Sequence, residues 1–281
     1  LSLVIGFVFL VKGADFLVDG ASSLARKLKV STLDIGLTVV AFGTSMPELI
    51  VNIFASTRGN TDIAIGNIVG SNIVNILLIL GASMIIYPLA VKKGTVWKEI
   101  PLALLAAIMV ILLANDAFID GGFSSALTRI DGVVFIAFFI IFIYYIFGIH
   151  KIEDRQGLEV KVYSLSKSCL MIIGGLIALT LGGKIIVDAA VATARALAVS
   201  EACIGLTIVA IGTSLPELAT SVTAAFKKNS DIAVGNIVGS NIFNVFFVLG
   251  ISAIISPLPF SPILNFDIWA LIGPFILILI G

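Results

Sequence analysis

The chain has 281 residues, of which 59% are hydrophobic and only 12% are charged, and its mean hydropathy is +1.17. A soluble domain of this composition would precipitate, so we expect a polytopic membrane protein. The 17 basic and 17 acidic residues balance, and no basic block points to nucleic acid as a partner. Cys169 and Cys203 stand far apart in the sequence, which argues against a disulfide or a cysteine metal site.

Apolar segments of about 20 residues, the length that crosses a bilayer, recur along the whole chain. They predict membrane spans at 1–24, 34–57, 62–87, 97–114, 130–149, 168–198, 203–226, 231–255 and 267–281. We therefore expect an all-α polytopic membrane protein. Its predicted parts are a first transmembrane repeat at 1–149, a polar loop at 150–167 and a second transmembrane repeat at 168–281.

The two halves of the chain carry the same long segment. Residues 36–75 return without a gap as residues 205–244, at an offset of 169, and 12 of 14 positions are identical between 62–75 and 231–244. The first repeat contains five spans, an odd number, so the two copies are expected to lie in opposite orientations in the membrane. The same offset places the partner of the fifth span beyond residue 281, so we expect a tenth helix outside this sequence.

Each copy holds a glutamate, Glu48 or Glu217, inside a segment long enough to span the membrane. An ionisable residue at that depth is costly and by default marks a function. The proline directly before each glutamate has no N–H to donate. Backbone carbonyl oxygens near Thr44 and Thr213 are therefore expected to lack a helical hydrogen-bond donor. Such oxygens, together with carboxylates, are what a desolvated hard cation needs. A plain packing kink is the alternative, but it does not explain a glutamate repeated beside it.

A polar stripe follows each glutamate. It places an amide, a hydroxyl and an amide at four-residue intervals on one helix face: Asn67, Ser71 and Asn75 in the first copy, and Asn236, Ser240 and Asn244 in the second. Gly235 and Gly239 on the same segment have the GxxxG spacing that lets a neighbouring backbone approach closely, as do Gly66 and Gly70. The stripe could simply hold helices together, but its duplication opposite a duplicated glutamate favours an ion site. Neither repeated motif contains a histidine or a cysteine, which argues against zinc or copper as the bound metal.

Charge placement predicts the orientation. Twelve of the 17 basic residues fall on one side of the predicted membrane and three on the other. Because basic residues collect in cytoplasmic loops, the N-terminus should lie outside the cell and the 150–167 loop in the cytoplasm. Within the spans, Lys12 with Asp15 and Lys184 with Asp188 are spaced for ion pairs along one helix.

The motifs GTSMPEL with GNIVGSNIVN, and GTSLPEL with GNIVGSNIFN, resemble the two alpha-repeats of the cation/calcium exchanger superfamily, most of all those of prokaryotic sodium/calcium exchangers, archaeal or bacterial. The resemblance implies ten helices in two inverted five-helix repeats. It also implies a secondary antiporter of the cell membrane that exchanges Na⁺ for Ca²⁺ by alternating access. On this reading the chain is not an enzyme, needs no cofactor and has no obligate protein partner beyond the lipid bilayer.

The resemblance carries over to individual residues, with Glu48 and Glu217 as the charged ligands of both ions. The remaining ligands that it implies are oxygen donors: the carbonyls of Ala41, Thr44, Ala210 and Thr213, the hydroxyls of Ser45, Ser71, Ser214 and Ser240, and the amides of Asn75 and Asn244. Asn244 stands where relatives often have Asp, so exchange should be independent of K⁺.

Three other functions stay open from the sequence. An H⁺/Ca²⁺ exchanger of the same fold would need both glutamates to carry protons. A channel would need a continuous pore rather than a site between two broken helices. An intramembrane protease would need a base beside Ser45 or Ser214, and neither serine has a histidine or lysine companion in its motif.

Overall fold

The computed structural model describes residues 2–59, 61–89, 97–119, 121, 124–149, 161–197 and 210–280. The described parts of all nine predicted spans are helical, which confirms the all-α fold. Among these residues, four helices are long and apolar enough to cross a membrane alone, and Thr32–Thr44 with Met46–Thr57 forms a broken span bent by 46°. The predicted loop at 150–167 lies mostly outside the described residues.

The first repeat begins with the long helix α1 (Ser2–Leu28). Its other elements are α2 (Thr32–Ile35), the π-helical turn η1 (Gly36–Val40), α3 (Ala41–Thr44), α4 (Met46–Thr57), α5 (Thr61–Ile73), the π-helical turn η2 (Val74–Ile79), α6 (Leu80–Ile86), α8 (Glu99–Ala114), α9 (Asp116–Ile119) and α10 (Arg129–Ile149).

The second repeat begins with the long helix α11 (Leu165–Ala196). It continues through α13 (Ala210–Thr213), α14 (Leu215–Phe226), α15 (Ser230–Phe243), the π-helical turn η4 (Asn244–Leu249), α16 (Gly250–Ile255) and α17 (Leu264–Ile280). One short ladder was not predicted from the sequence: β1 (Ala126–Leu127) pairs antiparallel with β2 (Leu258–Pro259) and links the two repeats at one end of the bundle.

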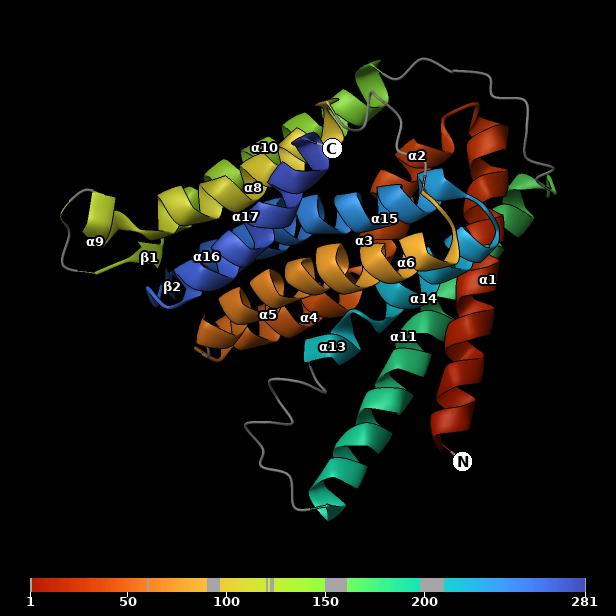
Figure 1. The fold of residues 1–281 in the computed structure, drawn as a ribbon, viewed down its shortest axis with the longest axis horizontal. Helices are drawn as coiled ribbons and strands as arrows, with labels where there is room; N and C mark the ends of the chain where they lie inside the picture. Colours follow the sequence, from red (N-terminus) through yellow and green to blue (C-terminus); the bar gives the residue numbers. More distant parts are fainter. Residues whose placement is uncertain are drawn as a thin grey trace.

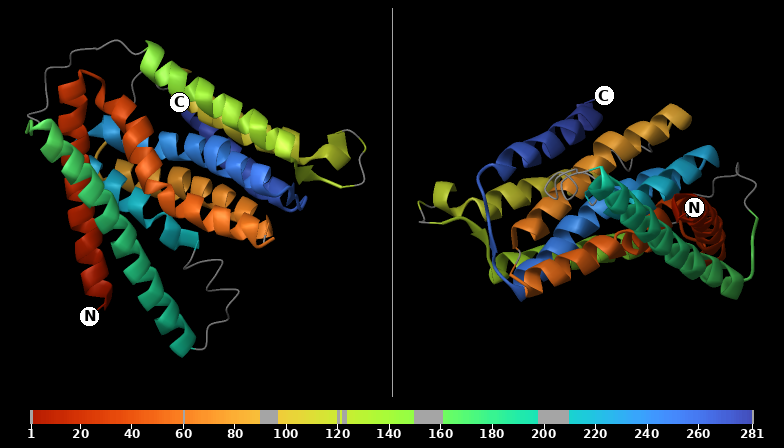
Figure 2. Two further views of the ribbon diagram at one scale, coloured as in Figure 1. Left: turned by 180° about the vertical axis from the view of Figure 1, so that it is seen from behind. Right: turned by 90° about the horizontal axis from the view of Figure 1, so that it is seen from below.

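The helices form two groups. In Figure 1, α1 and α11 lie side by side, steeply inclined to a bundle that contains α4, α5, α15, α16 and α17. Figure 2 shows the same division from behind and from below. Apolar side chains from α5, α8, α10, α15, η4 and α17 fill the core of the bundle, including the fully buried Phe135, Phe246 and Phe275.

The two glutamate-bearing spans are broken at equivalent places. Ser45 (φ −83°, ψ 7°) separates α3 from α4, and Ser214 (φ −86°, ψ 6°) separates α13 from α14. In both, the proline that follows lies in the first turn of the new half-helix, where its missing N–H costs no intrahelical bond. Each span therefore consists of two half-helices, and each glutamate lies at the start of the second one.

Glycines set the distance between α15 and the broken span of the first repeat. A Cβ added to Gly239 would lie 2.6 Å from the Leu37 carbonyl oxygen, and one added to Gly235 would lie 2.9 Å from that of Leu33. The GxxxG motif thus holds α15 against η1 as predicted. At Gly66 and Gly70 an added Cβ would meet nothing within 4 Å among the described residues.

The ion pairs of α1 and α11 differ in part from expectation. Lys184 and Asp188 form the predicted pair, at 2.8 Å. The pairing of Lys12 with Asp15 is wrong, because Asp15 and its neighbour Asp19 lie 3.2 Å and 2.7 Å from Nζ of Lys227, at the end of α14. Sequence spacing along one helix could not reveal a partner 212 residues away.

Helices α1 and α11 approach each other through glycine. A Cβ added to Gly175 would lie 2.7 Å from the Gly13 carbonyl oxygen and 2.8 Å from the Leu17 nitrogen, and Gly6 meets Gly182 in the same way. The neighbouring Gly174 is exposed, and an added Cβ there would meet nothing within 4 Å. These two adjacent glycines allow a matched test of the contact.

We expect Gly175→Ala to lower the melting temperature of the purified protein in detergent, because its methyl group must push two backbones apart. Gly174→Ala should leave the melting temperature unchanged or raise it, since alanine favours a helix over glycine by about 1 kcal/mol. Thermal unfolding followed by intrinsic fluorescence measures both. Equal melting temperatures for the two variants would contradict the close contact.

Candidate cation-binding site

The two glutamates are deeply buried in the bundle. Glu48 is 0% exposed and Glu217 is 1% exposed. Within the described part of the chain, no lysine or arginine forms an ion pair with either, and each keeps one oxygen, Oε2, without a hydrogen-bond donor. A buried carboxylate without a positive partner costs several kcal/mol, so this arrangement calls for a bound cation or a proton.

Serines join the glutamates across the two repeats. The Ser45 hydroxyl donates to Oε1 of Glu217 at 2.9 Å, and the Ser214 hydroxyl donates to Oε1 of Glu48 at 3.4 Å. Ser71, from α5, also donates to Oε1 of Glu48 at 3.4 Å. The structure thus brings five of the predicted site residues into one cluster, and the serine at each helix break faces the glutamate of the other repeat.

Thr44 is anchored by its side chain beside this cluster. Its hydroxyl donates to the side-chain oxygen of Asn236 at 3.0 Å. The Asn236 amide in turn donates to the backbone oxygen of Glu217 at 3.3 Å and to the Ser221 hydroxyl at 2.9 Å. Asn236 therefore ties the Thr44 side chain to the Glu217 backbone, while the matching Thr213 lies half-buried at the end of α13.

Three further predicted polar residues lie on α15 and on the π-helical turns that follow α5 and α15. Asn75, Ser240 and Asn244 are all at least 99% buried. The side-chain oxygens of these three residues have no hydrogen-bond donor. Because Ser71 and Asn75 share one helix face, as do Ser240 and Asn244, the open oxygens extend the cluster along both helices.

The Ala41 carbonyl oxygen already accepts two hydrogen bonds from the protein. It accepts from the Ser45 backbone N–H at 3.0 Å and from the Thr44 hydroxyl at 3.3 Å. Ala210 is the first described residue of α13. The role of these two carbonyls as ligands stays a prediction.

Not every residue of the predicted polar stripe faces the glutamates. Asn67 donates to the Asn52 side-chain oxygen at 2.7 Å, and Asn52 donates to the Ala64 carbonyl at 3.0 Å and to the Ser252 hydroxyl at 3.3 Å. This part of the stripe holds α4, α5 and α16 together. Hence the stripe splits into an end at Asn67 that joins three helices and an end at Ser71, which bonds to Glu48.

Four residues near the centre were missed from the sequence. Asn72 and Asn241 bond to Asn244 and Asn75, while Asn52 and Ser221 hold the stripe residues Asn67 and Asn236. Asn72 and Asn241 had a signal, because both are repeated directly after the site serine in the triplet GSN. Asn52 and Ser221 differ in type between the copies, which concealed their equivalent positions.

The π-helical turns mark the same region. η2 begins one residue before Asn75, and η4 begins at Asn244. A π-helical turn widens the helix and is frequent at functional sites. These turns accompany the buried amides in both repeats.

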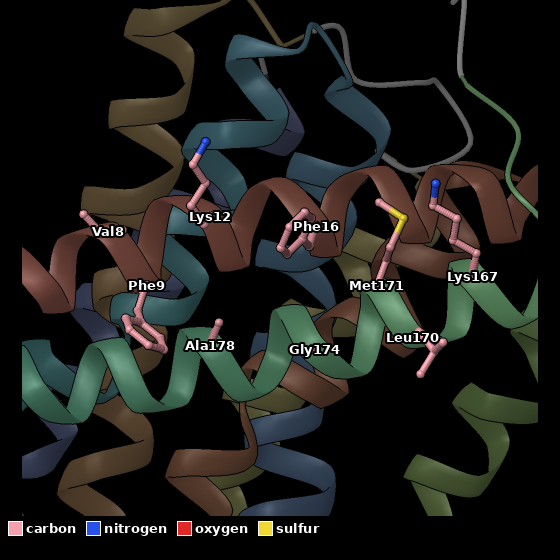
Figure 3. A pocket seen from close by; sticks show the side chains of 9 residues that line it. All are labelled: Val8, Phe9, Lys12, Phe16, Lys167, Leu170, Met171, Gly174 and Ala178. Carbon is pink, nitrogen blue, oxygen red and sulfur yellow. The ribbon is translucent and has the colours of Figure 1, made fainter.

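A separate groove of about 470 Å³ lies between α1 and α11 (Figure 3). It is lined by Val8, Phe9, Lys12, Phe16, Lys167, Leu170, Met171, Gly174 and Ala178. Its lining includes no carboxylate, hydroxyl or amide side chain. The groove therefore lacks the donors that a cation requires and is distinct from the glutamate cluster.

Comparison with known proteins gives consistent matches over most of the chain. The family model described as "Sodium/calcium exchanger protein" matches residues 1–148 and 167–281. "Inner membrane protein YrbG" of Escherichia coli K12 is 38% identical over 275 residues, covering 93% of this chain and 81% of that protein. "Sodium/calcium exchanger MaX1" of Methanosarcina acetivorans is 33% identical over 299 residues, covering 92% and 83%.

A solved structure also matches. The sodium-calcium exchanger NCX_Mj, soaked with zero Na⁺ and Ca²⁺, aligns with a TM-score of 0.86 at 34% identity, covering 99% of this chain and 88% of that one. The match extends over both groups of helices, including the two broken spans.

We expect Glu48→Gln or Glu217→Gln to weaken Ca²⁺ binding at least 100-fold, because one carboxylate of two is lost from a buried site. Isothermal titration of the purified protein with Ca²⁺ in Na⁺-free detergent measures this. Glu99→Gln is the matched control: Glu99 is also 1% exposed, but it lies in α8 and bonds to Tyr145. Near-normal binding by Glu48→Gln would contradict the assignment.

Proposed function

The chain belongs to the sodium/calcium exchanger family, and from this premise we propose that it is a Na⁺/Ca²⁺ antiporter whose Glu48 and Glu217 bind the two ions in turn. A membrane-embedded cation/Ca²⁺ antiporter is the function of the family. The observation that carries the finer proposal is the pair of buried glutamates, bridged by serines of the opposite repeat and each left with one open oxygen.

The proposed ligand set combines the open side-chain oxygens with further oxygens that the resemblance to the exchangers implies. The charged ligands are the two glutamates, and the neutral ones are the hydroxyls, amides and carbonyls of the residues around them: Ala41, Thr44, Ser45, Ser71, Asn75, Ala210, Thr213, Ser214, Ser240 and Asn244. Hard cations such as Ca²⁺ take six to eight oxygen ligands, a number that this set can supply. Serine hydroxyls that now donate to the glutamates can turn to accept an ion.

Charge supports alternation between the two ions. The glutamates contribute two negative charges, which one Ca²⁺ neutralises. Two Na⁺ would do the same, and the neutral oxygens provide room for a third. If three Na⁺ bind, the loaded site carries one net positive charge in one half-cycle and none in the other, so transport is electrogenic.

We also propose how the chain is arranged in the cell membrane. Residues 1–149 and 168–281 form two inverted transmembrane repeats, with the N-terminus outside and the 150–167 loop in the cytoplasm. The charge distribution supports this orientation. Alternating access then comes from movement of α1 and α11 against the bundle that holds the glutamates.

One observation also favours a second function, H⁺/Ca²⁺ exchange. Two buried carboxylates with open oxygens could each be neutralised by a proton instead of by Na⁺. The nature of the coupling ion thus decides between the two proposals.

We expect Ca²⁺ uptake into proteoliposomes to be driven by an outward Na⁺ gradient. A K⁺ gradient should have no effect, because Asn244 adds no negative charge to the centre. Uptake of radioactive Ca²⁺ with Na⁺, K⁺ and H⁺ gradients imposed in turn is the measurement, and Glu48→Gln is the inactive control. Uptake driven by H⁺ but not by Na⁺ would establish the second function in place of the first.

We expect membrane voltage to shift the exchange. One elementary charge moved across 100 mV is worth about 2.3 kcal/mol, or roughly a 50-fold change in the attainable Ca²⁺ ratio. With voltage clamped by K⁺ and valinomycin, an inside-positive potential should accelerate Ca²⁺ entry driven by internal Na⁺, since three positive charges leave as two arrive. If the rate of Ca²⁺ entry and the final Ca²⁺ level are the same at every clamped voltage, exchange is electroneutral.

A further inference from the structure

We propose that Asn72 and Asn241 are positioning residues, which orient the amides of Asn244 and Asn75 so that each presents its oxygen, rather than its nitrogen, to the bound ion. This inference rests on the proposed function, because it takes Asn75 and Asn244 as ligands. It assigns a task to two residues that touch no glutamate in the structure.

The four asparagines form a reciprocal pair of bonds across the repeats. The Asn75 amide nitrogen donates to the side-chain oxygen of Asn241 at 3.1 Å, and the Asn244 amide nitrogen donates to that of Asn72 at 3.0 Å. All four side chains are 0 or 1% exposed. Each ligand amide is therefore held by a residue of the opposite repeat, in a place that water does not reach.

An amide needs such a partner if it is to bind a cation. Its oxygen and its NH₂ group have nearly the same shape, so packing alone does not decide which one faces the ion. A bond that engages the NH₂ group on one side leaves the oxygen free on the other. The structure has this arrangement, because Oδ1 of both Asn75 and Asn244 is buried without a donor.

The position of Asn72 and Asn241 along the helix suits this task. Each follows a site serine by one residue, so its side chain points about 100° away from that serine around the helix axis. Its bond to an asparagine of the other repeat shows that it faces that repeat. Asn72 is itself held, since its amide donates to the Asn241 backbone oxygen at 3.2 Å.

A double-mutant cycle tests the proposal. We expect Asn241→Leu and Asn75→Ala each to weaken Ca²⁺ binding about tenfold. The double variant should bind no more weakly than Asn75→Ala alone, because Asn241 acts only through that amide. Asn72→Leu and Asn244→Ala should behave in the same way. Calcium titration of purified protein and the KM for Ca²⁺ in Na⁺-driven uptake are the two readouts.

The Asn115–Asn265 pair is the matched control. These asparagines exchange two bonds of 2.9 Å near the ends of α8 and α17, away from the glutamates. Asn115→Leu should lower the melting temperature but leave Ca²⁺ affinity unchanged. If Asn241→Leu does not fold, Asn241→Ser replaces it in the double-mutant cycle. The shorter serine side chain places its oxygen farther from the Asn75 amide.

Two results would overturn the inference: Ca²⁺ binding unchanged in Asn241→Leu, or an effect that adds in full to that of Asn75→Ala. Glu48→Gln, measured beside them, separates this failure from a failure of the proposed function. If Glu48→Gln still binds Ca²⁺, the ion site itself is wrong. If it loses Ca²⁺ while the asparagine variants do not, only the positioning role is wrong.

Discussion

Two carboxylates buried together impose the constraint on which the rest of this structure depends. Glu48 and Glu217 are almost completely shielded from water, and within the described residues neither has a basic partner. Leaving both charged without compensation would cost a large share of the 5–15 kcal/mol that stabilises a typical fold. The protein reduces that cost locally: each glutamate lies in the first turn of a half-helix, where the helix dipole favours negative charge, and each accepts a serine hydroxyl. Under the proposed function, a bound cation would offset the remaining deficit.

The repeat explains why the compensation is shared between the two halves. Within one broken span, the serine at the break and the glutamate three residues later do not bond to each other in this structure. With two copies, the break of one faces the glutamate of the other, so Ser45 serves Glu217 and Ser214 serves Glu48. The asparagines repeat this exchange one turn away. Because every one of these bonds crosses between the repeats, neither half can form the site alone, and both must be held in register by the packing of α15 against η1.

The features predicted from the sequence are those that depend on local composition or on the repeat. Apolar length gave the spans, and the duplicated glutamates and serines are found together in one cluster. What escaped prediction depends on contacts between distant segments. The partner of Asp15 is Lys227 rather than Lys12, and Asn67, in register with Ser71, bonds to Asn52 instead of facing a glutamate. The π-helical turns escaped because apolar periodicity varies too little over six residues to distinguish them from α-helix.

The different kinds of contact within and between the helix groups bear on the proposed mechanism. Inside the α1 and α11 pair, backbones touch at successive glycines, so the two helices are held as one unit. By contrast, the ion pairs of Lys227 with Asp15 and Asp19, which join α1 to the end of α14, have side chains 29–43% exposed, and pairs of this kind contribute at most about 1 kcal/mol. The predicted ligands lie on α3, α4, α5, α13, α14, α15 and the turns that follow α5 and α15, and none lies on α1 or α11. The pair also meets its neighbours through buried apolar side chains, among them Leu17, Ile35 and Ile232, and through a buried bond from Asn229 to Ser22 at 3.0 Å. Apolar contacts are non-directional, so the proposed movement of the pair would slide along them and leave the ligand geometry intact, as alternating access around a fixed site requires.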